Sequence, residues 1–159
     1  MGIVTGAALL FLFALMAPSA IQVHATTATH VTGLSTASNE VATVVGTSGN
    51  LVYESITSSL TFTGGMVGTG PATAFAILNT VTGHIVFTEQ AFFTGTIGGS
   101  KSGSVIILID GSGSVTGGTH AHDLLVHGTG GLAGIQAEGN QKTAAGSSTT
   151  SFSLWVQFG

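Results

Sequence analysis

Two histidines separated by one residue, His120 and His122, are the side chains of this sequence best suited to metal chemistry. Residues two apart on a β-strand project from the same face about 7 Å apart, so both imidazoles could reach one ion. A third ligand would have to come from another strand, and Glu138 or His84 could supply it. Because Gly117–Gly118 precedes the pair, two solvated histidines at a strand end are the favoured alternative.

Glu138 is the candidate for acid–base catalysis. A carboxyl group enclosed by apolar side chains has a raised pKa and can exchange a proton near neutral pH. Strand alternation places Glu138 on the opposite face from Ile135, although a bulge at Gly134 or Gly139 would change that. A glutamate that caps a turn by accepting backbone N–H groups is the favoured alternative.

Two further acidic residues, Asp123 and Glu89, are weaker candidates for a functional role. Asp123 lies four residues before His127, on the opposite face from the histidine pair; the two could form a hydrogen bond, but an exposed polar edge is the favoured interpretation. Glu89 lies in the aromatic-rich segment Val86–Phe93. It could line a cavity, but an outward position that keeps the strand soluble is favoured.

Phenylalanines are the candidates for contacts with an apolar ligand. Phe62, Phe87 and Phe152 occur in segments with the alternation of β-strands. Inward-facing rings either fill the core of a small barrel, which is the default, or line a pocket for one small molecule.

The composition excludes several function classes. Only 5% of the 159 residues are charged, with two lysines, no arginine and a net charge of −4, so clustered basic residues for nucleic-acid binding are absent. The chain has no cysteine, which excludes disulfides and thiol chemistry. No cofactor is expected, because no helix is predicted after the glycine-rich segments and none contains a P-loop lysine.

The N-terminus predicts export. Residues 3–17 are almost continuously apolar, and Val23 and Ala25 place small residues before a cleavage site, as in a secretory signal peptide over residues 1–25. An uncleaved anchor is the alternative, although the segment falls short of the roughly 20 apolar residues of a spanning helix. We therefore expect a secreted or cell-envelope-associated protein without a stable membrane span after cleavage.

The remaining chain has the period of β-strands. Phe152–Phe158 alternates strictly, and Val105–Ile109 is apolar on both faces, which predicts a half-buried and a covered strand. Other expected strands are Glu40–Val45, Leu51–Ser58, Leu60–Thr63, Ala72–Leu78, Gly83–Thr94, Thr119–Val126 and Ile135–Lys142.

Glycine clusters mark the expected turns, Gly68–Pro71 and Gly111–Gly113 among them. Short strands between regular turns predict an all-β fold, a single antiparallel up-and-down barrel of about eight strands and lipocalin size. We expect a polar, Thr-rich tail over residues 26–38 and the barrel domain over residues 39–159.

Glycine-rich motifs also carry a family resemblance. Phe62–Gly70, Phe93–Val105, Gly128–Gly134 with Glu138, and Phe152–Phe158 resemble, in order and spacing, domain-of-unknown-function family 3224 (DUF3224). That family is grouped distantly with the allene-oxide-cyclase barrels, so the resemblance implies a small β-barrel and, by analogy with the trimeric cyclases, a homo-oligomer. This chain departs from the family in having very few charged residues.

These observations favour a non-catalytic, exported barrel that binds a small apolar ligand or serves as an envelope or structural module. One alternative is an isomerase or cyclase acting inside the barrel, similar to allene oxide cyclase, with Glu138 as its catalytic residue. Another is a metal-dependent enzyme that uses His120 and His122.

Export makes a testable prediction. In an exporting host, cleavage after Ala25 leaves residues 26–159, because the apolar segment directs translocation and small side chains fit the peptidase. The intact mass of the secreted chain checks this. A mass that retains residues 1–25 would establish the uncleaved anchor instead.

Overall fold

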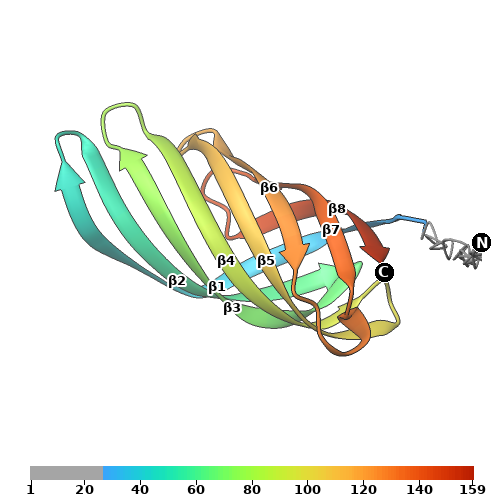
Figure 1. Cartoon of the computed structure of the whole chain (residues 1–159). Coiled ribbons are helices and arrows are strands. Elements are labelled where there is room, and N and C mark those ends of the chain that lie inside the picture. Colours follow the sequence, from blue (N-terminus) through green and yellow to red (C-terminus); the bar gives the residue numbers. More distant parts are fainter. Residues whose placement is uncertain (1–26) are drawn as a thin grey trace, which may run out of the picture.

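Eight antiparallel strands, each hydrogen-bonded to the next and the last to the first, form one closed barrel (Figure 1). This computed structural model describes residues 27–159. Its elements are β1 (Thr29–Ser48), β2 (Leu51–Gly64), β3 (Met66–Asn79), β4 (His84–Ile97), β5 (Lys101–Ser114), β6 (Gly118–Val126), the short 3₁₀ helix η1 (Gly130–Leu132), β7 (Ile135–Thr143) and β8 (Thr149–Phe158). The predicted all-β, up-and-down barrel is confirmed. Within residues 27–159, no helix is long and apolar enough to cross a bilayer.

The barrel starts earlier than the sequence suggested. β1 begins at Thr29 and pairs with β8 from Thr29 to Thr36, so most of the expected tail over residues 26–38 is strand. Buried and exposed positions do alternate in this segment, but most of its residues are small or polar, so the pattern is not one of apolar against polar residues. Val31 and Ser35 are buried while Thr32 and Thr36 are exposed. The predicted signal peptide over residues 1–25 lies outside the described residues and stays a prediction.

Two of the expected turns are strand interiors. Gly68–Pro71 lies within β3 and Gly111–Gly113 within β5. At Gly68 a Cβ atom would stand 2.8 Å from Cε2 of Phe93, and at Gly111 it would overlap the Phe87 ring. These glycines are therefore positions where the inner face of the barrel makes room for an aromatic ring.

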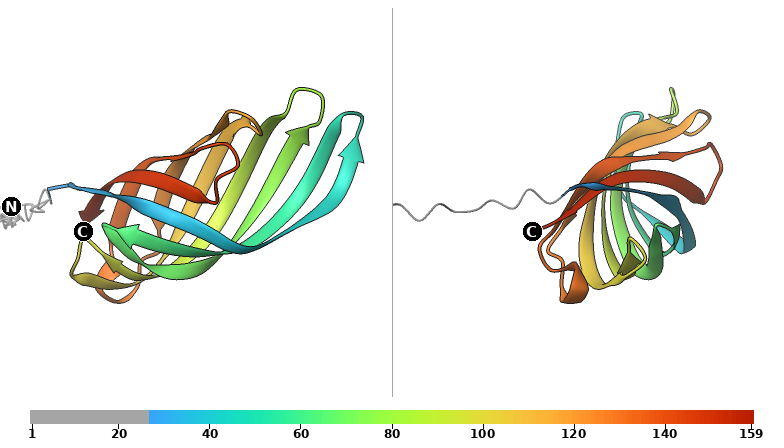
Figure 2. Two further views of the ribbon diagram at one scale, coloured as in Figure 1. Left: turned by 180° about the vertical axis from the view of Figure 1, so that it is seen from behind. Right: turned by 90° about the vertical axis from the view of Figure 1, so that its right-hand side faces the viewer.

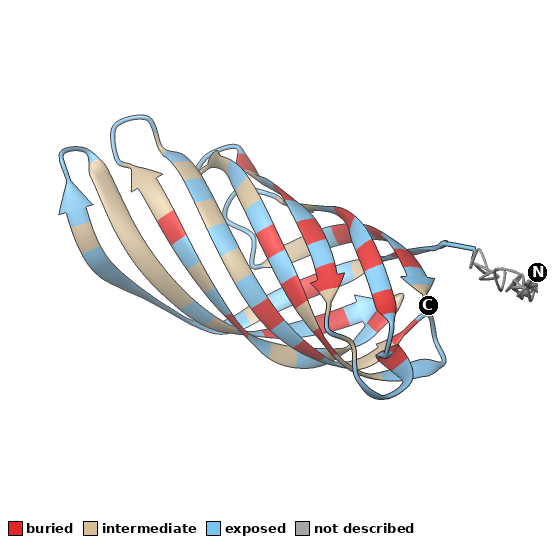
Figure 3. Ribbon diagram, in the orientation of Figure 1, coloured by how far each residue is buried: buried red, intermediate tan, exposed pale blue. Residues whose placement is uncertain are grey.

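One end of the barrel is filled with side chains. Buried residues concentrate towards the end that carries the start of β1 and the C-terminus (Figure 3). Phe62 packs edge-on against Phe93, and their ring centroids are 5.2 Å apart. The ring centroids of Phe62 and Phe152 are 6.2 Å apart. Phe93 is fully buried, so this aromatic cluster closes the packed end of the barrel.

The opposite end is open. The hairpins β1–β2 and β3–β4 extend beyond β5–β8 at this end (Figure 2). β1 pairs with β8 only as far as Thr36, and the Ala37 N–H then donates to the Ser148 carbonyl over 2.9 Å. From Val41 to Ser48, β1 pairs with β2 alone. The barrel thus has a filled end and an end whose interior is less fully enclosed.

A bulge in β1 changes which residues face the open end. Ser38 lies opposite Ser59 but Val41 lies opposite Thr57, so β1 contains one extra residue, and Asn39 takes a positive φ of 52°. An extra residue exchanges the two faces of the strand. Glu40, which regular alternation from Val31 would turn outward, therefore faces the interior, although it is exposed there.

The packed end makes a stability prediction. Phe93→Ala should lower the free energy of unfolding by about 3–5 kcal/mol, because it leaves a cavity in a filled core. Phe92→Ala is the matched control: Phe92 is the next residue, faces outward and is 50% exposed, so its loss should cost less than about 1 kcal/mol. Denaturant unfolding of both variants measures the difference. Equal losses would contradict a filled interior at this end.

Candidate functional site

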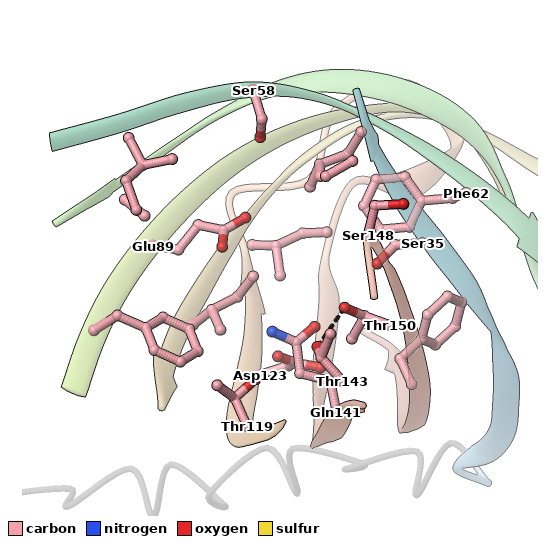
Figure 4. Close-up of a pocket in the computed structure, with 18 of the residues that line it drawn as sticks. Ser35, Ser58, Phe62, Glu89, Thr119, Asp123, Gln141, Thr143, Ser148 and Thr150 are labelled. Carbon is pink, nitrogen blue, oxygen red and sulfur yellow. Dashed lines mark hydrogen bonds between the residues drawn. The ribbon is translucent and has the colours of Figure 1, made fainter. Parts of the chain in front are cut away.

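The interior of the barrel contains a cavity of about 230 Å³ between the packed aromatic cluster and the open end (Figure 4). Its wall combines apolar side chains with polar side chains that come from several strands. Apolar lining residues include Ile56, Leu60, Phe62, Ala74, Ala76, Ile85, Phe87, Ile107, Ile109, Leu125 and Leu154; polar ones include Glu40, Glu89, Thr119, Asp123, Gln141, Thr143 and Thr150. The volume suits a ligand smaller than a typical drug-sized molecule.

Asp123 is the most unusual residue of this cavity. It lies in the middle of β6, its side chain is only 3% exposed, and its Oδ1 atom has no hydrogen-bond partner. Burial first, and the nearby Glu89 charge second, raise the pKa of Asp123 from its ordinary 3.8 to about 7. A buried polar atom without a partner costs about 1–3 kcal/mol, so this carboxyl group destabilises the unliganded barrel.

Glu89 belongs to the same row of the sheet as Asp123. Glu89 lies opposite Ile109, and Ile109 lies opposite Asp123, which separates the two acidic residues by two strand spacings, about 10 Å between Cα atoms. Burial raises the pKa of Glu89, and the Glu40 charge adds to that increase. We call Glu40, Glu89 and Asp123 the interior acids.

Neutral polar side chains stand beside the interior acids. The Thr143 and Thr150 hydroxyl groups share a hydrogen bond of 2.6 Å, and Gln141 and Thr119 also line the cavity near Asp123 (Figure 4). None of these groups is bonded to Oδ1 of Asp123. The cavity therefore combines an apolar wall with one acceptor that has no partner.

Glu138, the acid that the sequence favoured for catalysis, is not in this cavity. It is exposed on β7, where it lies opposite Leu124 on β6 and Trp155 on β8. The strand is regular at this point, so the bulge that would have turned Glu138 inward does not occur. The inward neighbours of Glu138 are Ala137 and Gly139, both buried.

The histidine pair also lies on the outer face. His120 and His122 are both exposed on β6, on the opposite face from Asp123. Among residues 27–159, no group of three or more His, Cys, Asp or Glu side chains is placed to hold a metal ion. The favoured interpretation of Asp123 and His127 as an exposed polar edge was wrong for Asp123, which is buried. His127 is exposed beyond the end of β6, with a φ of 56°.

The three phenylalanines predicted for a ligand site all line the cavity. Phe62 and Phe152 are buried and pack against each other at the filled end. Phe87 is only partly buried and lies nearer the open end.

The interpretation of Glu89 as an outward residue was wrong, and Glu40 and Asp123 were not recognised as site residues. Glu89 shares its parity with Phe87, Ala91 and Phe93, and that alternation was the signal that could have placed it inside. Glu40 had no such signal, because it reaches the interior only through the bulge in β1.

The fold and cavity define a class, the small closed β-barrel with an acid-containing interior. This fold is similar to the crystal structure of a protein of unknown function from the DUF3224 family of Shewanella oneidensis MR-1, with a TM-score of 0.69. The alignment covers 83% of this chain and 98% of that chain at 18% sequence identity, so the resemblance seen in the glycine motifs is confirmed at the level of the fold. No protein-family model matches the sequence, and no curated protein matches it.

The interior acids predict an unusual pH dependence. Because the folded state binds the Asp123 proton more tightly than the unfolded chain does, stability falls as pH rises from about 4 to about 7. The slope is at most about 1.4 kcal/mol per pH unit from this group, or about 4 kcal/mol in total, and Glu89 adds in the same direction.

Asp123→Asn should remove most of this dependence of the free energy of unfolding on pH. The variant should therefore be more stable than the wild type by at least about 2 kcal/mol near pH 8. Asp110→Asn is the control, because Asp110 lies on the neighbouring strand but is exposed. Denaturant unfolding from pH 4.5 to pH 8 makes the comparison. Parallel curves for the wild type and Asp123→Asn would show that Asp123 titrates normally.

Proposed function

We propose that this barrel is a binding protein for a small, mainly apolar molecule, which enters from the open end and occupies the interior cavity. The cavity itself is the observation that supports this: about 230 Å³ bounded by isoleucine, leucine, alanine and phenylalanine side chains. Apolar walls with a few converging polar groups are typical of small-molecule sites.

The distribution of side-chain size along the barrel supports the same proposal. At the filled end, large rings occupy the interior. Around the cavity, β3 presents Ala74 and Ala76 instead, and these leave room that larger side chains would fill. A barrel interior that its own side chains fill only in part can accommodate a small ligand.

Acid–base catalysis in the same cavity is a second candidate, favoured by the pKa of about 7 at Asp123. A carboxyl group that titrates near neutral pH and faces a cavity is suited to moving a proton on a bound molecule. This is the isomerase alternative with Asp123 in the place expected for Glu138. Turnover that depends on Asp123 would distinguish catalysis from binding.

Titration with toluene, followed by NMR of the protein methyl groups, tests the binding proposal. Toluene has no charge and no hydrogen-bonding group, so it reports the apolar cavity alone. We expect a Kd below about 1 mM, equivalent to about −4 kcal/mol, and shifts confined to methyl groups of the cavity, such as those of Ile107, Ile109 and Leu125.

Two substitutions on one strand provide the control. Ala74→Phe places a ring in the cavity and should weaken toluene binding at least about tenfold, whereas Thr73→Phe places the same ring on the outer face and should not. Circular dichroism verifies that both variants fold. Toluene binding that both variants weaken equally, or that shifts no cavity methyl group, would contradict the proposal.

A further inference from the structure

Acidic side chains converge on the cavity from three separate strands: Glu40 from β1, Glu89 from β4 and Asp123 from β6. A fourth, Glu54 on β2, lies opposite the buried Ala76 and so shares the inner face one row further towards the open end. In a chain with only six acidic residues, four on one inner face form a strong local bias.

No basic side chain of residues 27–159 balances these acids. Lys142 is exposed, next to the inward-facing Gln141. Lys101 lies at the filled end, where its Nζ stands 3.8 Å from the centroid of the Phe158 ring. The histidines in this range, His30, His84, His120, His122 and His127, are all exposed. The cavity thus gathers acidic groups with no basic partner from the part of the chain that the structure describes.

The unpartnered Oδ1 of Asp123 is a separate indication of a ligand. The side chain is 97% buried and lines the cavity, yet the neighbouring hydroxyl and amide groups do not donate to it. Buried acceptors in folded proteins almost always have a donor. A donor carried by a bound molecule would complete this one.

The geometry points to a ligand with a single organic cation, and we propose that the cavity binds an amine whose ammonium group lies against Asp123 and Glu89 while its apolar body contacts the isoleucine and phenylalanine wall. The proposal rests on the binding function above and adds the charge of the ligand. A metal ion fits less well, because no three ligating side chains come together among residues 27–159.

Binding of an amine should be coupled to proton release. Burial keeps the Asp123 carboxyl largely protonated below about pH 7, and an ammonium group favours the ionised form. Affinity should therefore rise with pH, by up to about tenfold per pH unit for one released proton. Burial also raises the pKa of Glu89, so proton release from Glu89 would add to this pH dependence. Glu40 and Glu54 face the same space, and no inward-facing base among the described residues opposes the effect.

Calorimetric titration of the folded barrel with benzylamine and benzyl alcohol tests the proposal. The two compounds have nearly the same size and shape, but benzylamine stays protonated from pH 5 to pH 8 and benzyl alcohol is neutral. We expect benzylamine to bind at least about tenfold more tightly than benzyl alcohol at pH 8, and this preference to shrink by about tenfold or more at pH 5. Titration near pH 6 in buffers of different ionisation enthalpy should show release of about one proton.

Asp123→Asn and Glu89→Gln should each reduce the preference for benzylamine at pH 8 by about tenfold or more and leave benzyl alcohol binding within about threefold. Asp110→Asn removes an exposed acid from β5 and should change neither ligand, which controls for net charge.

The outcomes separate the two proposals. If toluene and benzyl alcohol bind in the cavity but benzylamine has no advantage at pH 8, the apolar-ligand function stands and the cationic ligand is overturned. If benzylamine is preferred but Asp110→Asn weakens it as much as Asp123→Asn does, the preference comes from general surface charge and the site assignment fails. If neither toluene nor benzylamine binds, both proposals fall.

Discussion

The space inside an eight-stranded barrel is the constraint on which the rest of this structure depends. Such a barrel is just wide enough for inward side chains to fill it, so each large residue must face a small one. Phe152 fits because Gly33 has no Cβ, and Phe93 fits because of Gly68. Where large rings meet glycines the barrel is filled, and where alanines replace the rings it encloses a cavity.

The cavity places Glu89 and Asp123 in an environment that favours their neutral form. An apolar wall disfavours a carboxylate, and each carboxylate raises the pKa of the next, as Glu40 does for Glu89 and Glu89 does for Asp123. A buried, unpartnered carboxyl group costs stability, as at Asp123. Titratable groups held in such a state by burial and by one another are typical of functional sites.

The outer face of the barrel has a different character. Threonine and serine are its commonest residues, and it also carries the sequence-based candidates for chemistry, Glu138, His120 and His122. It also exposes apolar side chains on adjacent strands, such as Leu108 opposite Leu124. Export and a homo-oligomeric state remain predictions for this chain.

The sequence by itself determined the fold class and which phenylalanine side chains face the interior of the barrel. Alternating apolar residues and the near absence of charge predict half-buried strands wherever they occur, and this holds for Phe152–Phe158, so Phe62, Phe87 and Phe152 were placed inside correctly.

Only the tertiary structure decided which acids face the cavity. Faces alternate with every residue, so one bulge turns Glu40 inward, and regular pairing keeps Glu138 outward. Cross-strand register, which depends on contacts distant in sequence, brings Glu89 and Asp123 into one row. Glycine illustrates the same limit: its local preference predicts a turn at Gly111, but the Phe87 ring packed against it makes that position part of a strand.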